Sequence, residues 1–413
     1  MKQAQRRVAI TGLSALSCVG HGRDGLWDGC MAPSDRGVGR ITRFDPTPFN
    51  CQIAGEIHDF DPLASMDAQK AKRLDRFAQF SLASALDAMR DSGLDLGSMD
   101  RERFGIYVGS ALSGIAFAEE QHGEFIKRGI KGVRPTLAIS VFGGASSCNI
   151  AMELGTYGPN VANANSCASG AIAVGEAARL IARGETDAML AGAVECPLSA
   201  LAFGAFALIR AMSTRNDQPA TASRPFDAGR DGFVMAEGAG MLLLEEWDRA
   251  KARGAHVYAE VQGYATTNDA YSMTSPRVDA AQSLRCMRMA LDDAGCTAGD
   301  LGYINAHGSS TPLNDTYESL AIQRLLDGAR VPVSSTKGAH AHALGASGAM
   351  ELVLSAQVFD KACLPPTLNL TDIAEDCRGV ELFSQAREAK VDRVLSNSFG
   401  FGGINACVVL GRA

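Results

Sequence analysis

The stretch from residue 161 to residue 194 constrains the fold of this chain more than any other. A short, mostly apolar run, Val161–Ala164, ends in a tight turn of small residues that contains Cys167, and a helical pattern follows over residues 171–183. The next run, Thr186–Val194, is apolar at nearly every position, as is typical of a strand buried on both faces. A strand, a helix and a buried strand in succession predict α/β architecture with buried sheets.

The same alternation runs along the rest of the chain. Strands are expected at residues 7–13, 104–109, 238–245, 257–264, 302–306 and 406–410. Helices are expected at residues 67–92, 116–128, 140–154, 247–253, 279–294, 314–326 and 345–358. The second half thus repeats the order of the first, although the sequence similarity between them is too weak to prove that they are related.

Composition and charge exclude several classes of protein. The chain has 413 residues, a net charge of −7 and no basic run, so nucleic acid is not expected as a partner. No signal peptide of normal form fits the start, and no apolar stretch is long enough to span a bilayer, so we expect a cytoplasmic protein without membrane contact. The eleven cysteines are scattered without a CxxC pair, which indicates reduced thiols and disfavours a metal site.

Cys167 lies where a protein can present a nucleophile, at a sharp junction between a strand and a helix. We expect the N-terminus of the following helix to lower the pKa of the thiol, because unpaired N–H groups and the helix dipole favour the thiolate. The simpler alternative is a small buried cysteine without chemical function, which is the commoner case.

Two of the seven histidines lie in turns that suit chemistry. His307 follows a strand-like run and precedes a turn rich in hydroxyl groups, and His342 precedes a helix of small residues with Lys337 nearby. A single histidine of this kind is more often structural than catalytic. The presence of two such turns together with Cys167 favours a catalytic site.

Four sequence blocks in this order resemble one known family, the β-ketoacyl-[acyl-carrier-protein] synthases, and most closely the type called synthase II. The blocks are residues 165–170 (NSCASG), 306–315 (AHGSSTPLND), 337–348 (KGAHAHALGASG) and 397–405 (NSFGFGGIN). The resemblance runs from Val8 to Leu410. It implies the thiolase fold, in which two related halves, here residues 1–250 with the nucleophilic cysteine and 251–413 with both histidines, form a five-layered α-β-α-β-α sandwich.

The resemblance also implies a reaction and partners. The family performs a decarboxylative Claisen condensation of an enzyme-bound acyl group with malonyl-carrier protein, without a metal or a redox cofactor. Substrates arrive on the phosphopantetheine arm of acyl carrier protein. The family forms homodimers, and a heterodimer with a second ketosynthase-like subunit is the other assembly expected.

By the same resemblance, Cys167 accepts the acyl group, and His307 and His342 hold the malonyl thioester carbonyl while an enolate develops on it. Lys337 belongs to the polar network of the site. The backbone N–H groups of Cys167 and Phe401 form the oxyanion hole, and Phe401 gates the acyl pocket. The expected substrate-binding residues are Ser309, Thr311, Leu112 and Phe399.

The chain departs from the family pattern at several positions near the site. Asn165 and Ser166 replace Thr-Ala, Ala341 replaces a Gly, Ser309 replaces a Thr, and Ser347 replaces an Ala. None of these changes removes a catalytic group, so they bear on the shape of the pocket. Residues 135–138 (PTLA) lie where fatty-acid relatives often carry aromatics, which predicts an acyl chain other than an ordinary saturated one.

Three other functions stay open at this point. The first is a ketosynthase subunit of a type II polyketide or polyene pathway, paired with a chain-length subunit. The second is a thiolase acting on coenzyme A thioesters, which is disfavoured because the C-terminal glycine-rich loop has no cysteine. The third is a scaffold that binds carrier protein without turnover.

Overall fold

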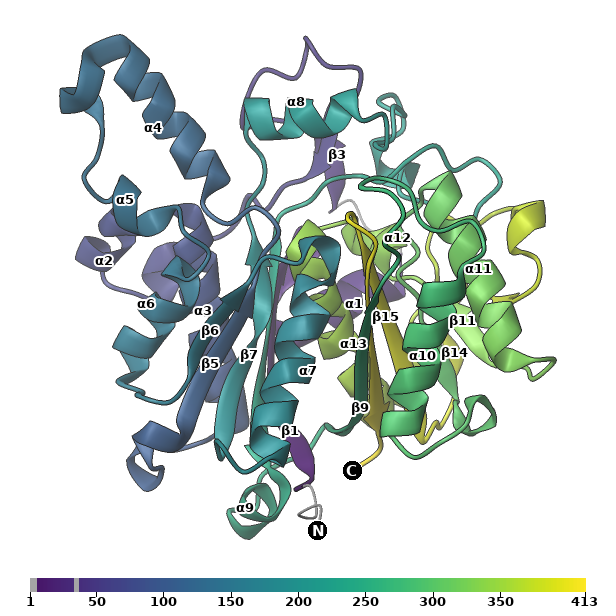
Figure 1. Ribbon diagram of the computed structural model, residues 1–413. Coiled ribbons are helices and arrows are strands. Elements are labelled where there is room, and N and C mark those ends of the chain that lie inside the picture. Colours follow the sequence, from purple (N-terminus) through teal and green to yellow (C-terminus); the bar gives the residue numbers. More distant parts are fainter. Residues whose placement is uncertain (1–5, 33–36) are drawn as a thin grey trace.

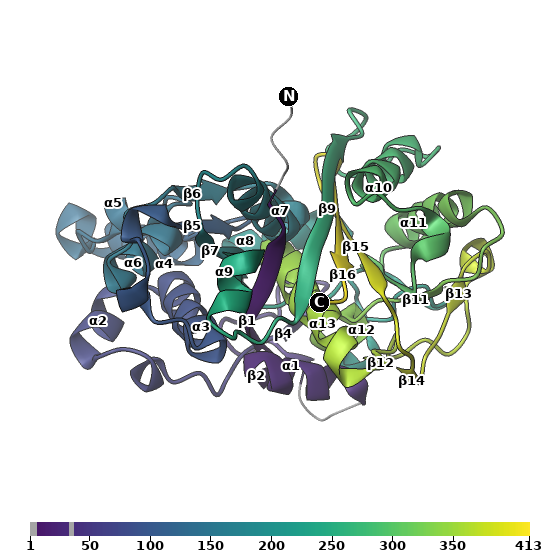
Figure 2. The same cartoon turned by 90° about the horizontal axis from the view of Figure 1, so that it is seen from below.

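The computed structural model describes residues 6–32 and 37–413 and contains one large mixed sheet. Its strands follow the order β13-β11-β10-β15-β16-β9-β1-β8-β7-β5-β6, and the short β2 pairs with β1. The sheet has two parts that meet where β1 and β9 pair, with Ala9 opposite Glu260 and Ile10 opposite Ala259. This junction lies near the middle of the molecule in Figure 2.

Both parts of the sheet are built from the same succession of elements. The first half contains β1 (Val8–Ser17), α3 (Arg76–Ser92), β5 (Phe104–Gly109), α6 (Ala145–Leu154), β6 (Asn160–Asn163), α7 (Ser169–Ala182), β7 (Ala188–Glu195) and β8 (Gly238–Glu246). The second contains β9 (Ala259–Asn268), α10 (Ala281–Asp293), β10 (Tyr303–Asn305), α11 (Pro312–Leu326), β11 (Pro332–Ser334), α13 (Ser347–Lys361), β15 (Arg393–Gly400) and β16 (Ile404–Gly411). The pairing directions also match, since the first and last strands of each half are antiparallel neighbours.

Helices α7 and α13 lie between the two parts of the sheet, and α3 and α10 pack against its outer faces (Figures 1 and 2). The middle helices are buried on nearly all sides, as helices packed between two sheets must be. A Cβ on Gly170 would lie 2.5 Å from the backbone nitrogen of Ala349, so glycine permits their close approach. With α3 and α6 outside the first part and α10 and α11 outside the second, the fold is the expected five-layered thiolase sandwich.

The boundaries of several elements differ from the sequence predictions. The helix expected at residues 67–92 is two helices, α2 (Ala68–Arg73) and α3, because Asp75 caps the second by accepting a hydrogen bond from the Ala78 N–H. The helix expected at 140–154 begins later, as α6 at Ala145, and the short α5 (Leu137–Ser140) precedes it. The helix behind Cys167 begins at Ser169.

Some elements were not predicted, namely α8 (Ala200–Leu208), α12 (Lys337–His340), β11 and the short pairs β3–β4 and β12–β14. The remaining bounds are α1 (Gly22–Met31), β2 (Gly20–His21), β3 (Val38–Arg40), β4 (Ile53–Gly55), α4 (Ile115–Arg128), α9 (Trp247–Ala252), β12 (Cys363–Leu364), β13 (Glu381–Leu382) and β14 (Arg387–Glu388). The division expected between residues 250 and 251 falls inside α9 and stays a prediction.

Helices α4 and α5 project from the first half, at the upper left of Figure 1. Apolar side chains are exposed on this projection and on the neighbouring α6, where Ile126, Ile139 and Met152 are 66–72% exposed. The adjacent strand β6 is the last strand of the large sheet. Among the described helices, none is both long and apolar enough to cross a membrane.

Candidate active site

Most of the residues predicted for the site surround one cavity of about 360 Å³. Its lining includes Cys167, His307, Ser309, Thr311, His342, Phe399 and Phe401. These residues come from both halves of the chain. The site therefore depends on the packing of α7 against α13, which brings the two halves together.

Cys167 lies in a single 3-10 turn, Ser166–Ala168, directly before α7. It is 7% exposed, and Ser166 before it adopts a left-handed backbone conformation with φ of 52°. A Cβ on Gly400 would lie 3.1 Å from the backbone nitrogen of Cys167, which is closer than side chains normally approach. The thiol is thus presented by a sharp turn that a glycine of β15 approaches closely.

The prediction that the helix N-terminus lowers the pKa of this thiol is wrong. Burial raises the pKa of Cys167 above its ordinary value, and it outweighs the Ser166 hydroxyl, the positive charge of Lys337 and the backbone N–H of Phe401, which act in the opposite direction. The cysteine is consequently a neutral thiol at neutral pH in the free protein.

His307 follows β10 and is held by buried charged groups. Its backbone N–H donates to Glu318 Oε1 at 2.8 Å, and the Gly308 N–H donates to Glu318 Oε2 at 2.8 Å. The Lys337 ammonium lies 3.4 Å from His307 Nδ1 and 2.6 Å from the His307 carbonyl oxygen. Because an ammonium group can only donate, Nδ1 accepts and the proton of a neutral His307 is on Nε2.

Lys337 is fully buried and contacts the buried carboxylate of Glu351 on α13. It does not line the cavity. Its place behind His307 matches the prediction that it belongs to the polar network of the site. Burial raises the pKa of Glu351 to about 7, with Lys337 acting in the opposite direction.

His342 is fixed by its backbone, a ring contact and a hydroxyl group. Its N–H donates to the Val234 carbonyl at 2.8 Å, and its ring packs edge-on against Phe233 with centroids 5.4 Å apart. Nδ1 lies 2.9 Å from the Ser347 hydroxyl at the start of α13. Ala341 before it has φ of 57° and ψ of −156°, a combination that favours glycine.

The two imidazole rings lie side by side with centroids 5.3 Å apart and an interplanar angle of 79°. Burial and the charge of Lys337 lower the pKa of both well below the ordinary value, so both are neutral at pH 7. Two neutral imidazoles that line the same cavity as a thiol can donate two N–H groups to one oxyanion.

Phe401 lies in the turn between β15 and β16. Its ring stacks on Phe206 of α8, with centroids 6.2 Å apart and an interplanar angle of 16°. Gly402 and Gly403 have φ of 84° and 73°, which glycine adopts without strain. These angles give the physical reason for glycines in this turn. Phe206 was missed because no element was predicted for residues 195–209.

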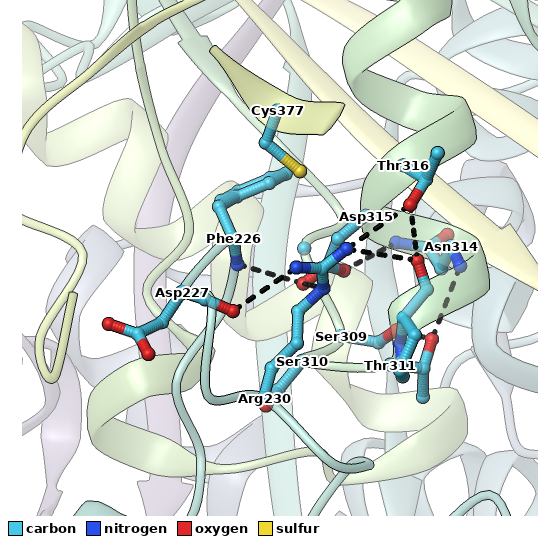
Figure 3. Close-up of polar contacts among 12 residues, drawn as sticks. Phe226, Asp227, Arg230, Ser309, Ser310, Thr311, Asn314, Asp315, Thr316 and Cys377 are labelled. Carbon is cyan, nitrogen blue, oxygen red and sulfur yellow. Dashed lines mark hydrogen bonds and ion pairs between the residues drawn. The ribbon is translucent and has the colours of Figure 1, made fainter. Parts of the chain in front are cut away.

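The hydroxyl turn after His307 rests on a buried ionic cluster. Ser309 and Thr311 hydroxyl oxygens are 2.9 Å apart, and Thr311 caps α11. Figure 3 shows Arg230 reaching toward Asp315 and Thr316 of that helix, and the Arg230 Nε to Asp315 Oδ2 distance is 3.7 Å. Burial raises the pKa of Asp315 to about 7. The cluster anchors the turn without lining the cavity.

Comparison with known proteins gives the family. The model "Beta-ketoacyl synthase, N-terminal domain" matches residues 5–250, and "Beta-ketoacyl synthase, C-terminal domain" matches residues 258–371. A 3-oxoacyl-[acyl-carrier-protein] synthase 2 of Coxiella burnetii is 41% identical to the chain, with 99% of each covered. The chain belongs to the β-ketoacyl synthase family.

Other family members agree with this assignment. A synthase 2 of Vibrio cholerae is 39% identical over 99% of the chain and 100% of its own length. The ishigamide ketosynthase/chain length factor has a TM-score of 0.93 at 31% identity, covering 99% of this chain and 100% of its own. A type II polyketide ketosynthase in complex with its acyl-carrier protein and bound to the hexaketide has a TM-score of 0.91 at 32% identity. The match covers 99% of this chain and 100% of that one. The predictions of the family, the fold and a condensing enzyme are confirmed.

One residue predicted for substrate binding lies away from this synthase's cavity. Leu112 is absent from the lining, and so are residues 135–138. The Leu112 N–H donates to the buried carboxylate of Glu195 at 3.0 Å, as do the Ala111 N–H at 2.6 Å and the Gly345 N–H at 3.1 Å. Glu195 was missed by sequence reasoning, and it ties the Leu112 turn to the segment after His342. Its role needs the tertiary structure to be seen, because its partners are distant in sequence.

Within residues 6–32 and 37–413, no group of three or more His, Cys, Asp or Glu side chains is arranged to hold a metal ion. All eleven cysteines are free thiols. Both observations concern the protein alone.

Proposed function

We propose that this condensing enzyme is an acyltransferase that elongates an acyl chain by decarboxylative Claisen condensation with malonyl-carrier protein. The observation that carries the proposal is the meeting of the Cys167 thiol with two neutral imidazoles in one cavity. The thiol suits the transfer of the acyl group, and the two imidazoles suit the decarboxylation step.

In the first step, the thiol of Cys167 takes the acyl group from the carrier thioester. The Cys167 proton leaves as the sulfur attacks, and the carrier thiol departs with a proton. Because the thiol is neutral, its proton has to leave on attack, and the departing carrier thiolate takes it up. The N–H groups of Cys167 and Phe401 stabilise the oxyanion.

In the second step, the malonyl thioester loses CO2 and the electron pair moves onto the thioester carbonyl as an enolate. The Nε2–H groups of His307 and His342 stabilise the developing negative charge. The enolate carbon then attacks the acyl-Cys167 carbonyl, and the sulfur leaves as the new carbon–carbon bond forms. Charge stabilisation by two N–H donors supports a reaction without a metal or a redox cofactor.

We further propose that the substrates arrive on the phosphopantetheine arm of acyl carrier protein, held by Ser309 and Thr311 at the cavity. Phe399 and Phe401 line the route to the thiol. We propose that Leu112 lines the acyl pocket only when the protein is a dimer, because it does not line the cavity of the single chain. The edge strand β6 and the exposed apolar α4–α6 projection support a dimer.

A second candidate is a ketosynthase subunit of a type II polyketide or polyene pathway, paired with a chain-length subunit. The full-length similarity to two ketosynthases of that kind supports it. The eleven free thiols support a cytoplasmic location for either candidate.

The test is a condensation assay with acyl- and malonyl-loaded carrier protein, comparing the wild type with Cys167→Ala. Wild-type product formation and its loss in the variant are expected. Full activity of the variant would remove the role of this thiol, and carrier binding without turnover by the wild type would favour the scaffold. The mass of the acyl group on Cys167 after co-expression with the native carrier would separate the two candidates.

A further inference from the structure

Ser347 contacts Nδ1 of His342, a histidine that lines the cavity. It is the first residue of α13 and is fully buried, and its hydroxyl lies 2.9 Å from His342 Nδ1. The family's usual alanine at this position has no hydroxyl, so the contact belongs to a departure of this chain from the pattern.

The direction of this hydrogen bond follows from the surroundings. Within the described part of the chain, His342 Nδ1 is the one hydrogen-bond partner of the Ser347 hydroxyl. If His342 donated from Nδ1, the serine proton would be buried without an acceptor, which costs the desolvation of that group. If Ser347 donates, both groups are satisfied. The serine is therefore the donor and Nδ1 the acceptor.

A neutral imidazole carries a single N–H, so an accepting Nδ1 leaves the proton on Nε2. Lys337 imposes the same tautomer on His307 by facing its Nδ1 at 3.4 Å. The two rings, 5.3 Å apart, are then both Nε2–H donors. With the other tautomer, His342 would present a lone pair to an oxyanion and repel it.

We infer that Ser347 is a positioning residue that fixes His342 as the Nε2–H tautomer and so prepares it to stabilise the enolate formed on decarboxylation. The inference about catalysis rests on the proposed function. The inference about the tautomer does not, and the two can be tested separately.

The tautomer is read by NMR of protein labelled with 15N-histidine, with His342→Gln used to identify the signals of His342. In the wild type, the non-protonated nitrogen is Nδ1. In Ser347→Ala, a substantial population with the proton on Nδ1 is expected. The matched control is Ser355→Ala, which removes a buried hydroxyl from the same helix. An unchanged His342 tautomer in Ser347→Ala would overturn the inference.

The catalytic consequence is read from two half-reactions. With malonyl-loaded carrier protein, Ser347→Ala is expected to decarboxylate about tenfold more slowly, the factor that corresponds to about 1.4 kcal/mol. Transfer of an acyl group to Cys167 should change less than about twofold, and Ser355→Ala should match the wild type in both. Equal losses in both half-reactions would contradict a role specific to His342. A changed tautomer in a protein whose wild type never decarboxylates would instead overturn the proposed function.

Discussion

Replacing Ala341 with glycine should relieve backbone strain directly before His342. Ala341 has φ of 57° and ψ of −156°, a region that is almost restricted to glycine. Its N–H donates to the Lys337 carbonyl at 3.1 Å, and the following N–H donates to the Val234 carbonyl at 2.8 Å. These contacts hold a conformation that alanine alone would leave. Ala343 offers a matched control, because it is equally buried but has an ordinary φ of −82°.

The magnitude follows from three contributions. A non-glycine residue in this region costs about 1–3 kcal/mol. Either substitution removes one buried carbon, which lowers the free energy of unfolding by about 0.8 kcal/mol. The greater freedom of glycine in the unfolded chain lowers it by about 0.4–1 kcal/mol more. Ala343→Gly should therefore lower the free energy of unfolding by about 1–2 kcal/mol. Ala341→Gly should leave the protein about 1–3 kcal/mol more stable than Ala343→Gly.

The assay measures the midpoints of guanidinium chloride unfolding for the wild type and both variants. All three are measured at one protein concentration, because self-association would make the apparent stability depend on concentration. The midpoint of Ala341→Gly should lie above that of Ala343→Gly, and the midpoint of Ala343→Gly should lie below that of the wild type. Equal destabilisation by the two substitutions would show that Ala341 carries no strain, and the reasoning would fail.

Two further predictions concern the reactive groups. The rate at which iodoacetamide alkylates Cys167 in the free protein should keep rising steeply with pH above neutrality, because burial raises the pKa of the thiol and keeps the thiolate scarce. A plateau below pH 8.5, measured by peptide mass mapping, would restore the idea of a thiolate stabilised by the helix. Replacing either His307 or His342 with Gln should slow malonyl decarboxylation by 10²-fold or more but acyl transfer much less, since the imidazoles donate to the enolate. Similar losses in the two half-reactions would contradict that assignment.

The sequence by itself determined those features that depend on neighbouring residues. The buried run at residues 186–194 and the turn at Cys167 each carry a local pattern, and each is found where it was expected. The order of the motifs identified the family, and with it the fold and a condensing enzyme. Local patterns were less reliable where a cap interrupts a periodic run, as Asp75 does between α2 and α3.

Only the tertiary structure decided what the site residues experience, because burial and polar partners come from segments far apart in the chain. Burial reversed the expected shift of the Cys167 pKa. Glu195 joins the Leu112 turn to Gly345, over a separation of more than a hundred residues. Gly170 at the start of α7 permits that helix to approach α13 closely, and Cys167 and His342 then line one cavity.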